Sequence, residues 1–153
     1  MSVKLRQEAA HLSAHHFTVD VEEYFQVSAF EARVQRTRWE LLESRVAANV
    51  AQLVRLLNEH RAKATFFILG WVAERHPELV RMVVEAGHEV ASHGWGHRRV
   101  TEQTPEEFRD SVRRTKQLLE DLIRGSRHRV SGAKLFDRSG LRVGVGYTAR
   151  GGL

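Results

Sequence analysis

Three short apolar segments alternate with longer segments of helical periodicity, and this alternation constrains the fold more than any other feature of the chain. The apolar segments are rich in β-branched and aromatic residues, as buried strands are, and cover residues 17–21, 62–69 and 88–92. Apolar residues recur at helical spacing in the segments that follow them, 39–61, 71–86 and 105–122. Strands that alternate with helices in this way are parallel and joined by crossover helices, so we predict an α/β fold.

Local signals predict where some of these helices begin and end. Pro77 lies inside the second helical segment and is expected to start a fresh turn, because it lacks a backbone N–H. Gly87 is typical of a helix C-terminus. Thr104 and Pro105, followed by two acids, are typical of an N-cap and a first helical turn.

The composition limits both location and metal chemistry. The chain has 153 residues, which is the length of one domain with a sizeable core, and no cysteine. Disulfides and thiolate metal sites are therefore excluded, and any metal would need His, Asp or Glu ligands. No apolar run has the length of a signal peptide or of a membrane span, so we expect a cytoplasmic location.

The net charge of +5 belongs to the end of the chain. Residues 124–153 hold seven Arg or Lys residues, one acid and seven of the eleven glycines, which leaves 17 basic and 18 acidic residues before them. This distribution argues against a nucleic-acid-binding domain, which would carry its basic residues on a folded surface. We divide the chain into an N-terminal extension (1–16), a domain (17–123) and a tail (124–153).

Two polar clusters follow predicted strands. Asp20, Glu22 and Glu23 lie at the end of the first strand, and His93 and His97 follow the third. Functional groups of α/β folds gather at the C-terminal ends of their parallel strands, so we expect the two clusters to meet. In an extended chain the first two acids point to one face and Glu23 points to the other.

The two histidines are four residues apart and could face one ion if their segment turns helically, with Gly94 and Gly96 giving the backbone freedom to do so. Neutral imidazole suits zinc and other first-row divalent ions. Such a pair is weak evidence by itself, since two surface histidines would look the same. A carboxylate beside them strengthens the prediction, because two histidines and one carboxylate form a known catalytic zinc site. The alternative for the acids is a solvated turn after a strand.

Longer strings resemble a known family. FTVDVEEYFQVSAFE and ATFFILGWVAERHPELVRMVVEAGHEVASHGWGH are similar to NodB-type polysaccharide deacetylases, carbohydrate esterase family four, and most of all to the exosortase-associated branch found beside exopolysaccharide genes. The resemblance covers about residues 17–123. It implies the N-terminal part of a distorted (β/α) barrel.

The resemblance also implies roles for the residues at the strand ends. Asp20 matches the acid that serves as catalytic base, and His93 and His97 match two metal-binding histidines. Glu22 takes the place of a carboxylate ligand. Many relatives have two adjacent aspartates where this chain has Asp-x-Glu, so Glu23 stays open as the alternative ligand.

The implied reaction is hydrolysis of an acetyl group, N-acetyl or O-acetyl, on an acetylated polysaccharide. A divalent metal, zinc first among the candidates, would act as cofactor. Trp95 lies between the two histidines in sequence and could line a sugar groove, with a packing role as the alternative.

Residues 124–153 depart from the family, whose members carry an Arg-x-Pro motif, an acidic motif and a late histidine motif beyond this region. A permitted back-translation of residues 124–147, read one base later, encodes AVPGTGFRAPSYSIGQASAWALD, and FRAPSYSIG resembles the Arg-x-Pro motif. We therefore predict an out-of-frame, disordered tail and an impaired enzyme, with an inactive metal-binding or regulatory fragment as the alternative. Coding DNA that is incompatible with the shifted string would contradict the frameshift.

Overall fold

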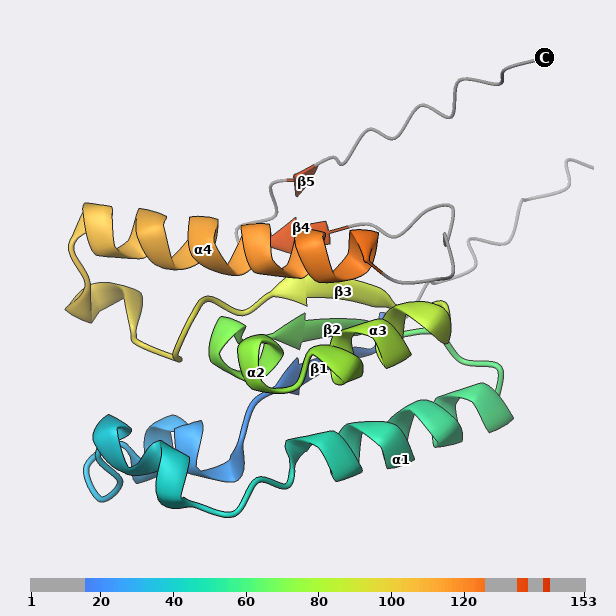
Figure 1. The fold of residues 1–153 in the computed structure, drawn as a ribbon, viewed down its shortest axis with the longest axis horizontal. Coiled ribbons are helices and arrows are strands. Elements are labelled where there is room, and N and C mark those ends of the chain that lie inside the picture. Colours follow the sequence, from blue (N-terminus) through green and yellow to red (C-terminus); the bar gives the residue numbers. More distant parts are fainter. Residues whose placement is uncertain (1–15, 126–134, 138–141, 144–153) are drawn as a thin grey trace, which may run out of the picture.

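The computed structural model describes residues 16–125, 135–137 and 142–143, which form one sheet with helices packed on it (Figure 1). The strands of the sheet, in spatial order, are β1 (Thr18–Val21), β2 (Thr65–Ile68), β3 (Glu89–Ser92), β4 (Leu135–Asp137) and β5 (Arg142–Val143). β1 to β4 are parallel to one another, and β5 pairs antiparallel with β4. The α-helices are α1 (Val46–Glu59), α2 (Gly70–Arg75), α3 (Pro77–Glu85) and α4 (Pro105–Arg124). The predicted α/β alternation with parallel strands is confirmed.

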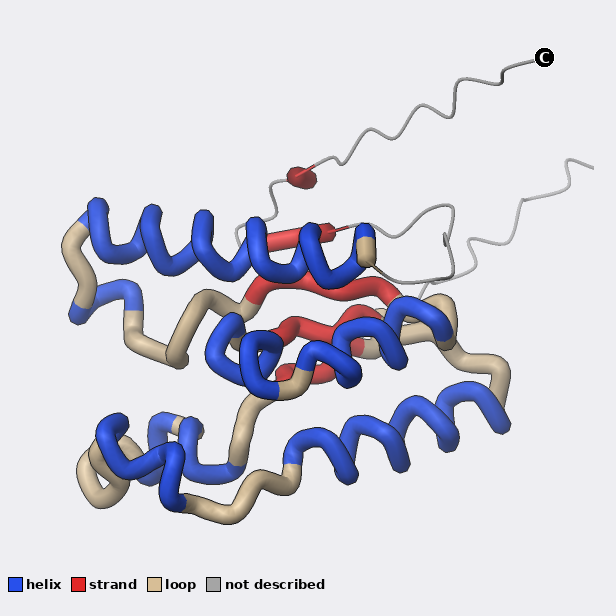
Figure 2. The backbone as a smooth tube through the Cα atoms, viewed as in Figure 1, coloured by secondary structure: helices blue, strands red, loops and turns tan. Residues whose placement is uncertain are grey.

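The core lies between the sheet and the helices, which cover one face of the strands (Figure 2). Strand side chains alternate, so Phe66 and Ile68 are fully buried against the helices whereas Phe67 is only half-buried. Each large apolar side chain buried in this way stabilises the fold by about 1.5–3 kcal/mol. Asp20, in register with Phe67, belongs to the face opposite the helices.

The first helical segment differs from the prediction at its start. A short 3-10 helix, η3 (Arg36–Leu41), precedes an extended break, and α1 begins only at Val46. The side chain of Glu23 accepts a hydrogen bond from the backbone N–H of Arg45 at 3.0 Å. A carboxylate at this position satisfies a donor at the helix N-terminus and complements the helix dipole, which fixes where α1 starts.

The other predicted helix boundaries are confirmed. Pro77 starts α3 after a break at His76, and Gly87 follows the end of α3 with a positive φ of 75°. Thr104 caps α4 in a capping box with Glu107: the Glu107 N–H donates to Thr104 Oγ1 at 3.2 Å, and the Thr104 N–H donates to Glu107 Oε2 at 2.9 Å.

Three short 3-10 helices complete the described elements. They are η1 (Tyr24–Gln26), η2 (Ser28–Phe30) and η4 (Val100–Glu102). Together with η3, the first two form the segment between β1 and α1, which lies beside the loop after β3 (Figure 1).

Most of the segments that we predict to be an N-terminal extension and an out-of-frame tail lie outside the described residues. The described residues of the tail are Arg124 and Gly125, at the end of α4, and the strands β4 and β5, which pair with the sheet where we predicted disorder. The edge of β3 offers unpaired backbone groups to any extended segment, whatever its side chains, so this pairing leaves the reading frame a prediction.

The first testable prediction concerns His88, a buried residue at the start of β3 that accepts a hydrogen bond from the Ala64 N–H at 3.4 Å. Burial, and the nearby Lys63 ammonium, lower the pKa of His88. The unfolded protein therefore binds a proton more readily than the folded protein, so stability is kept above about pH 6.5 and lost as the pH falls below it. His88→Gln cannot titrate, and we expect urea unfolding to show a smaller loss of stability between pH 7.5 and 5.5. An unchanged loss would contradict this prediction.

Candidate metal centre

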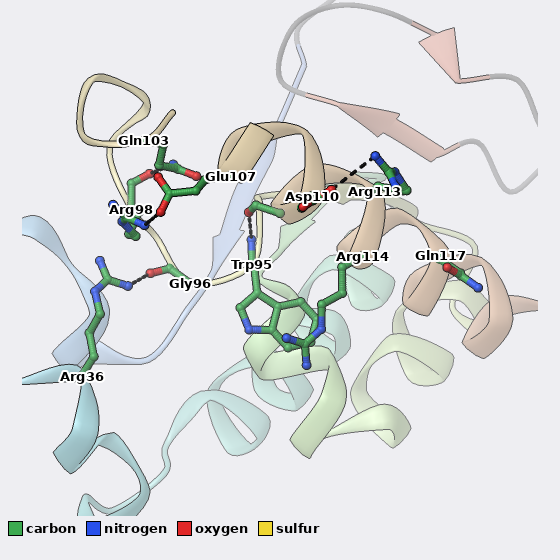
Figure 3. Close-up of a pocket in the computed structure, with 11 residues that line it drawn as sticks. Arg36, Trp95, Gly96, Arg98, Gln103, Glu107, Asp110, Arg113, Arg114 and Gln117 are labelled. Atoms are coloured by element: carbon green, nitrogen blue, oxygen red, sulfur yellow. Dashed lines mark hydrogen bonds and ion pairs between the residues drawn. The ribbon is translucent and has the colours of Figure 1, made fainter. Parts of the chain in front are cut away.

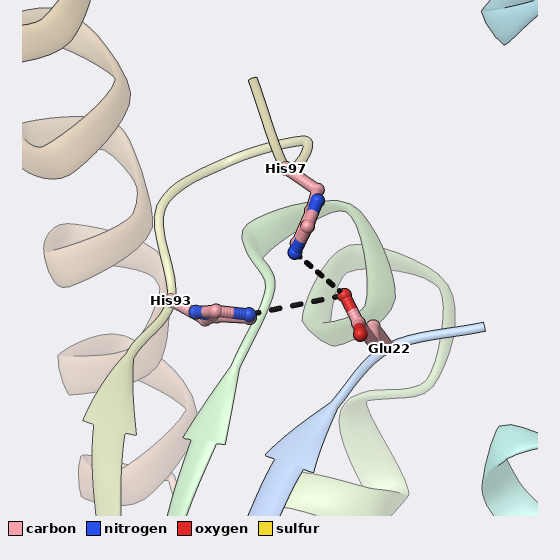
Figure 4. Close-up of side chains that lie close together, drawn as sticks. All are labelled: Glu22, His93 and His97. Carbon is pink, nitrogen blue, oxygen red and sulfur yellow. Dashed lines mark ion pairs between the residues drawn. The ribbon is translucent and has the colours of Figure 1, made fainter. Parts of the chain in front are cut away.

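The ends of β1 and β3 bring Glu22, His93 and His97 together, as the strand-end rule predicts (Figure 4). One ligand atom from each residue lies within 4.8 Å of the others. His97 Nε2 is 3.1 Å from Glu22 Oε2, and His93 Nε2 is 3.8 Å from the same oxygen. Two segments more than 70 positions apart in the sequence thus meet at one point because β1 and β3 are parallel and flank β2.

This donor set fits a divalent cation. Zn–N and Zn–O bonds of about 2.0–2.1 Å in a tetrahedral site place ligand atoms about 3.3 Å apart, and the two histidine nitrogens lie 3.1 and 3.8 Å from Glu22 Oε2. The imidazole planes of the two histidines are 71° apart with ring centres 5.2 Å from one another, so both edges can face one ion. Two histidines and one carboxylate also leave a position for water or substrate.

The loop that carries both histidines does not turn helically, so the two imidazoles face one another by a route other than the helical turn considered from the sequence. Gly94 and His97 have positive φ angles of 75° and 55°, so the chain reverses through the left-handed region at two points. Glycine adopts this region freely, whereas a histidine there costs about 1 kcal/mol that other contacts must offset.

The start of α2 holds the first half of this loop. The N–H groups of Gly70 and Trp71 donate to the carbonyls of Gly94 and Trp95, both at 2.9 Å. The Trp95 N–H in turn donates to Ser111 Oγ on α4, also at 2.9 Å. The unpaired N–H groups of a helix N-terminus are thereby used to fix the backbone on which His93 and His97 stand.

Asp20 lies beside the three ligand candidates without belonging to the group. Its Oδ2 is 3.9 Å from His93 Nε2, and its side chain is 42% exposed, compared with 17% for Glu22. The carboxylate is therefore close to the centre and reachable from solvent, as a general base requires.

Glu23, the alternative ligand, is turned away from the histidines. Its side chain is buried and accepts hydrogen bonds from Ser44 Oγ and from the Arg45 N–H, while the Glu23 N–H donates to Gln26 Oε1 at 2.8 Å. Strand alternation predicted this direction. The geometry therefore favours Glu22 over Glu23, and gives Glu23 the role of fixing the start of α1.

A second row of polar side chains superficially resembles a serine nucleophile with its base. His76 Nε2 lies 3.0 Å from Ser44 Oγ, and His76 Nδ1 lies 3.2 Å from Glu78 Oε1. However, the hydroxyl hydrogen of Ser44 is donated to the Glu23 carboxylate, so His76 does not accept it. These side chains thus form a hydrogen-bond network around the buried Glu23. Nucleophilic catalysis would need the Ser44 hydroxyl to donate its hydrogen to His76, which it does not do here.

Trp95 is packed between two neighbours, of which Figure 3 shows Arg114. Its indole lies against Gly70 on one side, and the Arg114 guanidinium stands 3.2 Å from the ring centre. Packing therefore accounts for its position, and its contact with a sugar stays a prediction. Trp95 also lines a pocket of about 660 Å³, together with Arg36 and Arg98. Arg36, which contacts the histidine loop, has no sequence signal that could have found it.

Comparison with known families decides the assignment. The family model described as polysaccharide deacetylase matches residues 40–131, well over half of the chain. The chain belongs to this family. The predicted membership of the polysaccharide deacetylase family is therefore confirmed.

Among related polysaccharide deacetylases, the peptidoglycan-N-acetylglucosamine deacetylase PgdA of Listeria monocytogenes is 38% identical over 65 residues, which cover 42% of this chain and 14% of the relative. A chitooligosaccharide deacetylase of Bradyrhizobium is 42% identical over 57 residues, which cover 37% of this chain and 26% of the relative. The chain thus spans about a seventh to a quarter of the length of these two relatives.

Solved structures of the family share the fold. A family 4 carbohydrate esterase from Streptomyces lividans has a TM-score of 0.54 at 23% identity, over 82% of this chain and 51% of that one. A putative polysaccharide deacetylase from Mycobacterium smegmatis has a TM-score of 0.53 at 29% identity, over 70% of this chain and 38% of that one. The predicted fold class, part of a polysaccharide deacetylase barrel, is confirmed.

The family match begins at residue 40, so it includes the histidine loop but not β1. The convergence of Asp20 and Glu22 on His93 therefore rests on the geometry alone. Over the described ranges, no helix is both long and apolar enough to cross a membrane.

Proposed function

We propose that this chain provides the metal-binding half of a deacetylase site that removes acetyl groups from a polysaccharide. The observation that carries the proposal is the meeting of Glu22, His93 and His97 at the ends of β1 and β3, in a chain of the polysaccharide deacetylase family. Zinc is the first candidate, because imidazole and carboxylate ligands suit it.

Each residue of the centre has a role in this proposal. Glu22, His93 and His97 would hold the cation, which supplies Lewis acidity toward the acetyl carbonyl and toward water. Asp20, exposed to solvent and 3.9 Å from His93, would accept a proton from the attacking water. Glu23 does not face the cation; its carboxylate accepts hydrogen bonds from Ser44 and Arg45 and so fixes the backbone next to Glu22.

N-acetyl groups are the proposed target. Among the relatives, one is named for peptidoglycan N-acetylglucosamine and another for chitooligosaccharide. An acetylated polysaccharide or oligosaccharide of N-acetylated amino sugars is therefore the substrate class to test first. The alternative is a module of the family that binds metal without catalysis.

The proposal is tested by Asp20→Asn, which keeps the shape of the side chain and removes its basicity. With the remaining part of a family member's domain supplied to complete the site, and with zinc present, we expect acetate release from a chitooligosaccharide to fall by about 10²–10⁴-fold, the usual contribution of a general base. Zinc affinity should change little, because Asp20 lies outside the ligand group.

The matched control is Asp121→Asn, which makes the same change on the exposed surface of α4 and should leave acetate release unaltered. Equal activity of Asp20→Asn and the unmodified chain would refute the role of Asp20. Zinc binding without any acetate release from the unmodified chain, even when the remaining part of the domain is supplied, would favour the non-catalytic alternative.

A further inference from the structure

Four successive carbonyls of the histidine loop are held from two sides. The start of α2 donates to the carbonyls of Gly94 and Trp95, as described above. The guanidinium of Arg36 reaches the next two: Nη1 donates to the Gly96 carbonyl (Figure 3), and Nη2 lies 3.4 Å from the His97 carbonyl. The second half of the loop, which ends in a candidate metal ligand, is thus held by one side chain from a distant segment.

Arg36 is itself fixed in place. It begins η3, and its guanidinium stacks 5.0 Å above the ring of Trp39, one turn further along. Trp39 is 6% exposed and packs edge-to-face on Trp71, the second residue of α2. Arg36 and the start of α2 therefore belong to one packed unit, and the loop lies across both.

This fixation matters because of the conformation of His97. Its φ of 55° is unfavourable for a side chain that carries a Cβ, and the flanking Gly96 leaves the backbone free to relax. A metal centre needs its ligand atoms within about 0.5 Å of their places, which a loop achieves only when its backbone is tethered. The two contacts of Arg36 fall on the carbonyls of these two residues.

We propose that Arg36 is a positioning residue, which holds the backbone of His97 so that its imidazole faces Glu22. The inference deepens the proposed function, since it assumes the same metal centre. Arg36 lies outside residues 40–131, the stretch that matches the family model. The segment between β1 and α1 would therefore contribute a supporting contact to the metal centre.

The positive charge of Arg36 allows a positioning role to be distinguished from a general electrostatic effect on zinc affinity. Arg36 is a cation, and removing a cation near a metal centre should by Coulomb's law leave metal binding unchanged or tighten it. Loss of a tether should weaken it. The two effects thus have opposite signs, which makes zinc affinity a decisive measurement.

The experiment measures the dissociation constant for zinc on the full chain, by competition with a chromophoric chelator. We expect Arg36→Ala to weaken zinc binding by about 10–100-fold, as loss of an outer partner of a ligand usually does. Arg36→Lys keeps one hydrogen-bond donor group and should therefore lose less affinity for zinc than Arg36→Ala. Arg38→Ala, which removes the same charge from an exposed position of η3, should bind zinc as the unmodified chain does.

A second measurement needs no metal. Trypsin can cut after Arg98, which follows the loop directly and is exposed. We expect Arg36→Ala to speed this cleavage in the metal-free protein at least severalfold relative to Arg38→Ala, with circular dichroism showing that both variants are folded.

The outcomes are distinct. Unchanged or tighter zinc binding and unchanged cleavage in a folded Arg36→Ala variant would overturn the proposal. Faster cleavage in a chain that binds no zinc, even unmodified, would refute the metal centre and keep the tether. Equal weakening by Arg36→Ala and Arg38→Ala would show a loss unrelated to the loop contacts, and would also overturn it.

Discussion

Replacing His97 by alanine is expected to weaken zinc binding by at least about 100-fold, or about 2.7 kcal/mol. The reason is that His97 offers one of three ligand atoms, and its Nε2 lies 3.1 Å from the Glu22 carboxylate. Removing it leaves two ligands, too few to hold a cation against water. His93→Ala should have an effect of similar size. Isothermal titration of the metal-free protein with zinc measures both.

His60→Ala is the matched control, because His60 is an exposed histidine at the end of α1, at the opposite end of the strands from the centre. It should bind zinc as the unmodified chain does. If all three variants bound zinc equally, the cation would be held elsewhere and the proposed centre would be wrong. The stability of each variant without metal, measured by urea unfolding, shows that any loss is local.

Gly70→Ala is expected to destabilise the fold by about 3 kcal/mol and to disturb the metal centre at the same time. A Cβ at this position would lie 2.7 Å from Thr115 Oγ1 and still closer to the Trp95 ring, so both neighbours must move. Overpacking of this kind costs about 1–3 kcal/mol, sometimes more. Since Gly70 and Trp71 hold the loop carbonyls, displacement of Trp95 should also weaken zinc binding. Urea unfolding and zinc titration measure the two effects.

Gly125→Ala controls for the exchange of glycine for alanine itself. Gly125 has a negative φ of −77°, and the nearest atom to an added Cβ is 3.4 Å away. Alanine fits this conformation, so stability should be unchanged or slightly higher. If Gly70→Ala lowered the free energy of unfolding no more than Gly125→Ala does, the contact between α2 and Trp95 would be loosely packed.

The sequence predicted the elements and their alternation because local signals specify both. Pro77 and the capping box at Thr104 set helix boundaries through backbone chemistry that acts within a few residues. Alternation of strands and helices then implied parallel strands, and parallel strands brought both polar clusters to one edge of the sheet. The meeting of Glu22 with His93 was predictable by this reasoning.

The sequence by itself thus determined the α/β architecture, the family and the residues that gather at the strand ends. Only the tertiary structure turned Glu22 toward the histidines and Glu23 away from them, broke the first helical segment before Val46, and gave the segment after His93 the form of a tethered loop. These outcomes depend on partners that are distant in the chain, such as Arg36 for the loop and the α1 N-terminus for Glu23. Residue periodicity indicates which face of a strand or helix a side chain occupies. The packing of the elements determines which hydrogen-bond partner that side chain meets on this face.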